Sequence, residues 1–72
     1  MSYWNYRVMK KNVGNDKYDF GIYEVYYDDN GNVQSTSKES IVPICASEQD
    51  LIYEIDLIKG AFKKETLTYA EN

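Results

Sequence analysis

The first half of the chain alternates between apolar and polar positions, a period of two that is typical of half-buried β-strands. One side of the segment from Tyr3 to Lys11 carries Trp4, Tyr6 and Val8. After a run of turn-forming residues, the segment from Tyr18 to Tyr27 is rich in aromatic and β-branched residues, and both of its faces are largely apolar. We therefore expect two strands, of which the second is central and covered on both sides.

A hairpin signal follows the second expected strand. The pair Asn30-Gly31 favours a tight turn, because both residues tolerate the positive φ of a type I′ loop. A two-residue loop at this point predicts that Val33 pairs with Asp28 and that Ser35 pairs with Tyr26. The chain then forms a third strand antiparallel to the second.

The third strand is expected to be a polar edge of the sheet. The run from Gln34 to Ser40 contains serine, threonine and charged residues and has little apolar surface to bury. Charges on an edge strand discourage unwanted pairing, yet an exposed edge also accepts a strand from a partner. Both interpretations stay open on the sequence alone.

An amphipathic helix is predicted from Glu48 to Lys64. Ser47 is suited to cap the first turn, acidic residues occupy the N-terminal end, and lysines occupy the C-terminal end, where the helix dipole favours each charge. At about 100° per residue, one narrow stripe of the helix is apolar, and we expect this stripe to pack on the sheet. It consists of Leu51, Ile55, Ile58 and Phe62, with Ile52 on its flank.

A second apolar row lies on another side of the same helix. Tyr53, Leu57 and Ala61 follow one another at intervals of four residues. This row either faces a partner or consists of apolar residues tolerated at the surface. Beyond the helix, the alternating segment Thr66–Tyr69 fits a short strand or a loose tail. The expected fold is a single α+β domain over residues 1–72, a three-stranded antiparallel sheet followed by one amphipathic helix.

Composition makes catalysis and metal binding poor explanations of this chain. It has no histidine and one cysteine, Cys45, so it can form neither a His-dependent nucleophile pair, nor an internal disulfide, nor a zinc site of the usual kind. The acidic turn Asp28–Asn32 does not match the register of a calcium loop. We expect no enzyme activity, no metal and no cofactor.

Charge and hydropathy restrict the partners. The formal net charge is −4 with a pI of about 4.6, which lacks the basic footprint of a nucleic-acid-binding domain. No apolar run is long enough to span a membrane, and the segment from Met1 to Lys10 lacks the apolar core of a signal peptide. With a single thiol in addition, we expect a cytoplasmic protein with no membrane or direct nucleic-acid contact.

Small size and many aromatic residues favour association with protein. A chain of 72 residues builds a small core, and domains of this size usually add a disulfide, a metal or a partner. Eight tyrosines and one tryptophan supply large side chains with a polar end, which suit interfaces. With disulfide and metal set aside, we expect self-association or a protein partner.

Three segments resemble a known family. Tyr6–Met9, Phe20–Tyr23 and Ser47–Ala61 are similar to the first strand, the second strand and the capped helix of the partner-binding domain of HicB-type antitoxins. The Pro-Asp-Leu-x-Gly-Cys stretch of that family is replaced here by the acidic hairpin, and its DNA-binding segment has no counterpart. The resemblance implies a partner-binding α+β domain without operon autoregulation. The strings Trp4–Val8 and Tyr23–Asp28 also resemble small uncharacterised bacterial and phage-borne proteins.

The sequence therefore predicts a non-enzymatic protein-binding module, a homodimer that acts as a small inhibitor or antitoxin-like partner. Two alternatives remain: a structural accessory subunit, and a small-ligand-binding domain whose aromatic pocket uses Arg7, the only arginine, to hold an acidic group. The predicted partner-binding residues are Trp4, Tyr6, Tyr23, Tyr26, Tyr27, Tyr53 and Leu57.

Overall fold

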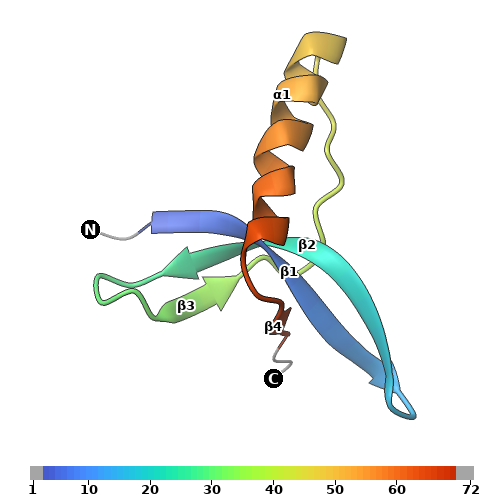
Figure 1. Ribbon diagram of the computed structural model, residues 1–72, viewed down its shortest axis with the longest axis vertical. Coiled ribbons are helices and arrows are strands. Elements are labelled where there is room, and N and C mark those ends of the chain that lie inside the picture. Colours follow the sequence, from blue (N-terminus) through green and yellow to red (C-terminus); the bar gives the residue numbers. More distant parts are fainter. Residues whose placement is uncertain (1–2, 70–72) are drawn as a thin grey trace.

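A computed structural model describes residues 3–69 and shows a curled sheet from which a single helix projects (Figure 1). The elements, in chain order, are β1 (Tyr3–Gly14), β2 (Lys17–Tyr27), β3 (Val33–Thr36), α1 (Glu48–Lys59), the 3₁₀ turn η1 (Gly60–Lys63) and β4 (Leu67–Thr68). The sheet order is β3-β2-β1-β4, with β4 parallel to β1 and the other pairs antiparallel. The α+β class and the β-β-β-α order are confirmed, and the C-terminal segment forms a short strand.

The long β1–β2 hairpin sets which side chains share a face. Tyr3 pairs with Tyr27 and the register runs from there to Gly14 and Lys17, so the turn is confined to Asn15 and Asp16. Both turn residues have positive φ, which asparagine and aspartate tolerate better than most residues. Directly paired residues of antiparallel strands lie on the same face, so this register decides the composition of each face.

The β2–β3 hairpin has a longer loop than the sequence predicts. Ser35 pairs with Tyr26 as expected, but Val33 pairs with Tyr27 instead of Asp28, and the register shifts between the two pairs. The Asp28 carboxylate accepts the backbone N–H groups of Asn30 and Asn32, at 2.9 and 3.0 Å. A side chain that satisfies two loop amides stabilises the wider turn, which the two-residue prediction did not take into account.

One face of the sheet carries most of the core. Met9, Tyr23, Val25 and Tyr27 are buried together, and Leu67 and Tyr69 of the C-terminal segment pack against them. The Tyr27 hydroxyl donates to Asn5 Oδ1 at 2.8 Å and accepts from Arg7 Nη1 at 3.0 Å. The C-terminal segment therefore covers this face, and a tyrosine at its centre joins polar groups of β1.

The opposite face receives the helix, and the apolar contacts are made mainly by the C-terminal end of the helix. Ile58 and Ala61 are buried, with Ala61 1% exposed, whereas Leu51 and Phe62 are 36% and 69% exposed. The prediction that Leu51 and Phe62 pack on the sheet is therefore wrong, as is the surface assignment of Ala61. Figure 1 shows α1 rising away from the sheet, which leaves Leu51 beyond the reach of the sheet. Phe62 lies in the 3₁₀ turn η1, which has about three residues per turn and so does not keep the 100° spacing of the predicted stripe.

The start of α1 agrees with the capping prediction. Ser47 has extended backbone geometry and its hydroxyl accepts the backbone N–H of Asp50 at 3.1 Å. Because α1 projects from the sheet at this end, the first turn has few packing contacts and depends more on the cap for its stability than most helices do.

A Ser47→Ala variant should lose about 1 kcal/mol of unfolding free energy, measured by urea denaturation. A Ser47→Asp variant, which retains a capping oxygen, should restore most of that loss, and an equal loss in both variants would contradict the capping role.

Candidate protein-binding surface

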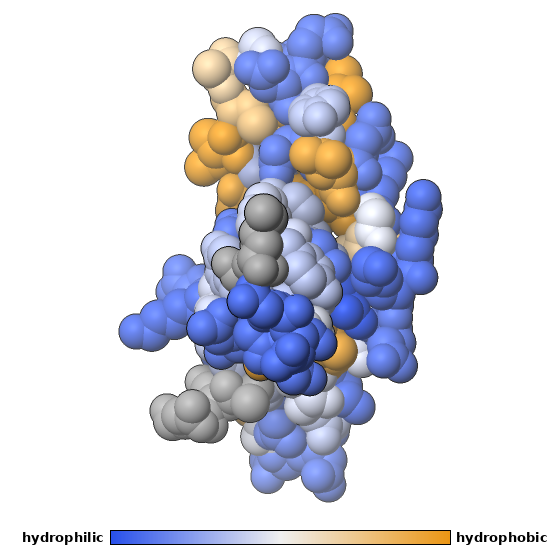
Figure 2. All heavy atoms as spheres, turned by 90° about the vertical axis from the view of Figure 1, so that its left-hand side faces the viewer, coloured by the Kyte–Doolittle hydropathy of each residue, from blue (hydrophilic) through white to orange (hydrophobic). Residues whose placement is uncertain are grey.

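The projecting part of α1 leaves apolar side chains uncovered on more than one side. Leu51 and Ile52 are exposed, as are Tyr53 at 66% and Leu57 at 47%. The preceding segment adds Val42 and Ile44, which are among the most exposed large apolar residues of the described chain. Figure 2 shows most of the hydrophobic side chains on this side of the molecule in its upper half, where α1 projects from the sheet, with polar side chains between them. In soluble proteins, surfaces of this kind mark protein or membrane contact sites or ligand-binding grooves.

The molecule also exposes more accessible surface than a compact protein of the same mass. Its accessible surface is 5677 Å², whereas a compact monomer of 8.4 kDa exposes about 4,600 Å². The radius of gyration is 13.3 Å, against about 11 Å for a compact domain of this length. The excess of about 1,000 Å² belongs to the molecule as a whole and reflects its extended β1–β2 hairpin as well as its projecting helix.

A hydrogen bond joins the exposed helix to the sheet. The Tyr6 hydroxyl of β1 donates to Glu54 Oε1 of α1. Partial burial, this hydrogen bond and the negative charge of Glu54 together raise the pKa of Tyr6 to about 12. The sequence analysis did not identify Glu54 as a contact residue. Its position four residues before Ile58, between the two apolar rows, indicates that it lies on the side of the helix that faces the sheet.

The raised pKa of Tyr6 predicts a late step in the tyrosine titration. In the unfolded chain Tyr6 ionises near its ordinary value of 10, and in the folded chain it ionises at about 12. The folded state therefore binds more protons in this range, so the stability that Tyr6 contributes is fully present below pH 10 and declines as the pH rises toward 12. Tyrosinate absorbance should show a step near pH 12 that is missing in Tyr6→Phe. Superimposable titrations of the two proteins would refute this assignment.

Three of the predicted aromatic residues share the helix side of the sheet. The rings of Trp4 and Tyr6 are edge-to-face at 5.1 Å, and Trp4 and Tyr26 lie 6.4 Å apart between centroids. The Tyr26 hydroxyl donates to Glu24, and this contact raises the pKa of Tyr26. These residues form a wall of aromatic rings at the base of α1.

Tyr23 and Tyr27 do not belong to this surface, although the sequence grouped them with it. They are 7% and 5% exposed and lie on the opposite face, where Tyr23 packs against Tyr69 and Tyr27 stacks on Tyr3. The register explains the difference, because Tyr27 pairs with Tyr3 while Tyr26 pairs with Trp4 on the other side. These two tyrosines are core residues and are withdrawn from the predicted interface.

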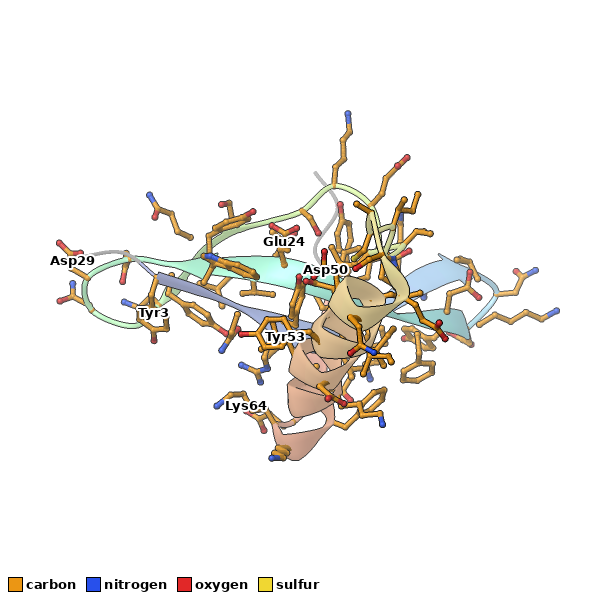
Figure 3. The ribbon with its side chains drawn as sticks, turned by 90° about the horizontal axis from the view of Figure 1, so that it is seen from above. Tyr3, Glu24, Asp29, Asp50, Tyr53 and Lys64 are labelled. Atoms are coloured by element: carbon orange, nitrogen blue, oxygen red, sulfur yellow. The ribbon has the colours of Figure 1, made fainter. Side chains whose placement is uncertain are left out.

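A hollow connects the aromatic wall with the exposed helix. Its volume is about 350 Å³, and it is lined by Trp4, Asn5, Tyr6, Leu57, Gly60, Ala61 and Lys64. The structure thus brings Trp4 and Tyr6 together with Leu57, which the sequence had placed on a separate patch. Figure 3, viewed down α1, shows Tyr53 and Lys64 extending to the same side of the helix, over the end of the sheet that carries Tyr3. The hollow, Leu57 and Tyr53 therefore form one continuous surface.

Arg7 lies elsewhere and has protein partners. It is on the core face, where Nη1 donates to the Tyr27 hydroxyl and Nη2 donates to the backbone oxygen of Glu65 at 2.8 Å. Nε is buried without a partner. Arg7 does not line the aromatic hollow. Its contacts tie β1 to the segment that follows η1, so the predicted use of Arg7 as an anchor for a ligand in an aromatic pocket finds no support in its position.

Comparison with other proteins gives no family for the chain. No protein-family model, curated protein or solved structure matches it. Within residues 3–69, no helix is long and apolar enough to cross a bilayer.

Proposed function

We propose that this chain is a non-enzymatic protein-binding module of the small-inhibitor or antitoxin-like type, and that it binds through the projecting part of α1. The observation that carries the proposal is the uncovered apolar surface of a helix that packs on its own sheet mainly at one end. A helix whose apolar residues face water is poorly stabilised by itself, because most helical stability in proteins comes from burial of an apolar face. A bound protein supplies that burial.

The chemistry of the surface suits a protein partner better than a small molecule. The hollow at the base of α1 offers few charged groups that could hold a small ligand, since Lys64 is its only charged lining residue. Around it, Trp4, Tyr53 and Leu57 supply the large aromatic and aliphatic side chains that dominate the binding energy of protein interfaces. The absence of histidine from the sequence favours a binding role over catalysis. We place this role in the cytoplasm, as expected for a chain with a single thiol.

Site-specific photo-crosslinking tests the proposal. A photoreactive phenylalanine analogue replaces Tyr53, which is exposed on the projecting part of α1. The matched control carries the analogue at Lys17, which is exposed at the far hairpin. After irradiation in the cells that make the protein, we expect a discrete protein adduct from position 53 and none from position 17. Adducts from neither position, or equal smears from both, would overturn the proposal.

A further inference from the structure

We propose that the hollow at the base of α1 receives an extended segment of the partner protein, which adds antiparallel to the edge of β1 and places a large apolar side chain in the hollow. A carboxylate two residues away in that segment pairs with Lys64. The inference rests on the proposed function, because the hollow belongs to the surface assigned there, and it names what the partner presents. Four features of the described residues carry it: the position of the hollow, the unpaired backbone of β1, Gly60, and the charge of Lys64.

The hollow lies along the edge of β1 and not over one face of the sheet. Trp4, Asn5 and Tyr6 line it in succession, although neighbouring side chains of a strand point to opposite faces. A hollow that three consecutive residues line therefore follows the edge of the strand. Figure 1 shows this first part of β1 at the border of the sheet, beside the base of α1. β4 pairs with β1 only at Met9 and Lys10, so no described strand covers the edge here.

The backbone of β1 offers hydrogen-bonding groups at this edge. The backbone oxygen of Lys10 accepts the N–H of Tyr69 at 2.9 Å, on the side of β1 away from β2. Backbone groups along an antiparallel strand alternate between its two sides, and the register with β2 is unbroken through this part of β1. The N–H and C=O groups of Trp4 and Tyr6 therefore point to the same side as those of Lys10. No described residue is hydrogen-bonded to them there, so an extended segment can add to the edge.

Gly60 leaves the hollow open at its helical end. Its φ of −58° and ψ of −24° are right-handed helical, so the backbone does not require glycine, which is less favourable in a helix than any residue except proline. A Cβ on Gly60 would meet nothing within 4 Å apart from its chain neighbours and the nearby backbone of its own helix. Close packing therefore does not require glycine either. Because Gly60 lines the hollow, we infer that a side chain at this position would occupy the space that the partner's side chain enters.

The lining of the hollow specifies the chemistry of the segment. The volume of about 350 Å³ is sufficient for a large side chain, since an apolar cavity of about 150 Å³ already holds a benzene ring. Trp4 and Leu57 are about half exposed and offer apolar contact. Lys64 is exposed and is the only charged lining residue, so a carboxylate complements it. Side chains two residues apart in an extended chain share a side, which gives a pattern of an apolar and an acidic residue with one residue between them.

Peptide binding followed by the fluorescence of Trp4 tests the inference. Trp4 is the only tryptophan and lines the hollow, so its emission reports occupancy. The probes are two short peptides with acetylated and amidated ends, Thr-Phe-Thr-Glu-Thr and Thr-Glu-Thr-Phe-Thr, because the acidic residue can follow or precede the apolar one. With the protein at about 1 µM, one of them should shift the emission to shorter wavelength and saturate below about 5 mM. No saturable shift with either peptide up to that concentration would overturn the inference.

Two N-methylated forms of the binding peptide separate strand addition from simple burial of the phenyl ring. In an antiparallel pair, a residue directly opposite Trp4 or Tyr6 directs its own N–H toward β1, and the next residue directs its N–H away. Methylation of the phenylalanine nitrogen should therefore raise the dissociation constant at least about tenfold. Methylation of the central threonine nitrogen should leave the constant nearly unchanged. Any other order of effects would contradict antiparallel pairing with β1.

Variants of two lining residues test the hollow itself. Gly60→Leu should fill the hollow and abolish the emission shift, whereas Gly60→Ala adds one carbon and should retain most of it. Both variants should unfold at higher urea concentration than the wild type, because both residues suit a helix better than glycine. Lys64→Glu should raise the dissociation constant of the glutamate peptide about tenfold and lower that of a peptide with lysine in place of glutamate. Full binding to Gly60→Leu, or no response to the charge exchange, would overturn the inference.

The occupant and the two proposals can be told apart. A shift of the Trp4 emission with protein concentration alone would assign the hollow to a second copy of the chain and overturn the partner segment. A photo-adduct at position 53 without any peptide shift would overturn the strand site and leave the protein-binding module standing. A peptide shift without an adduct at position 53 would support the strand site and overturn contact through the projecting part of α1.

Discussion

Replacing Tyr27 with alanine is expected to cost about 3–5 kcal/mol of unfolding free energy, the range for removal of a large buried aromatic ring. Tyr27 is 5% exposed, stacks on Tyr3 with ring centroids 4.7 Å apart, and belongs to the main core cluster. A chain of 72 residues has a total stability of about 4–11 kcal/mol. The variant should therefore be partly or wholly unfolded in mild urea, as measured by circular dichroism.

The Tyr27→Phe variant separates the ring from its hydroxyl. It keeps the packed ring but removes the group that donates to Asn5 and accepts from Arg7. Two partly buried polar groups then lose a partner, and we expect a loss of about 1–2 kcal/mol. Equal stability of the wild type and the alanine variant would show that Tyr27 is at the surface, as the sequence alone had suggested.

A second large effect is expected at the base of the helix. Ile58 is 8% exposed and lies where α1 meets the sheet, so Ile58→Ala should cost about 2–5 kcal/mol. Leu57 is its neighbour in the chain, is 47% exposed and offers a matched control. Leu57→Ala should change the stability of the dilute protein by less than about 1 kcal/mol. Urea denaturation at low protein concentration compares the two without a contribution from association.

The opposite order of effects would contradict the orientation of the helix. If Leu57→Ala destabilised the dilute protein more than Ile58→Ala, the helix would face the sheet with its other row, and the hollow at its base would not exist as described. Similar effects from the two variants would indicate a helix without a fixed face toward β1.

Local patterns in the sequence predicted the elements well, and the physical reason is that each pattern depends on near neighbours. Alternation with a period of two identified β1 and β2, and Ser47 identified the start of α1. The long loop at Asp28 escaped prediction because a single carboxylate accepts two backbone amides across the turn. Such a contact competes with the preference of Asn30-Gly31 for a shorter loop.

The candidate surface was predicted in part. Periodicity gives the angle of a side chain about the helix axis, but not the point along the axis where the sheet ends. Leu51 was therefore assigned to the core although it lies beyond the reach of the sheet, and Ala61 was assigned to the surface although it sits at the base. The aromatic residues were divided between two faces by the strand register, which puts Tyr27 beside Tyr3 and Tyr26 beside Trp4. Register depends on the whole hairpin and is not fixed by the composition of either strand.

Light scattering over a concentration series, from about 1 µM to about 1 mM, tests directly whether the exposed apolar side chains of α1 bind protein, with a second copy of the chain as the partner in the sample. The account predicts that the mass of the wild-type protein rises toward twice the chain mass of 8.4 kDa. It also predicts that Ile52→Glu, a change at a side chain that is 50% exposed in the single copy, keeps the fold and remains at the mass of one chain. A wild-type protein that stays at 8.4 kDa at every concentration would contradict self-association through α1.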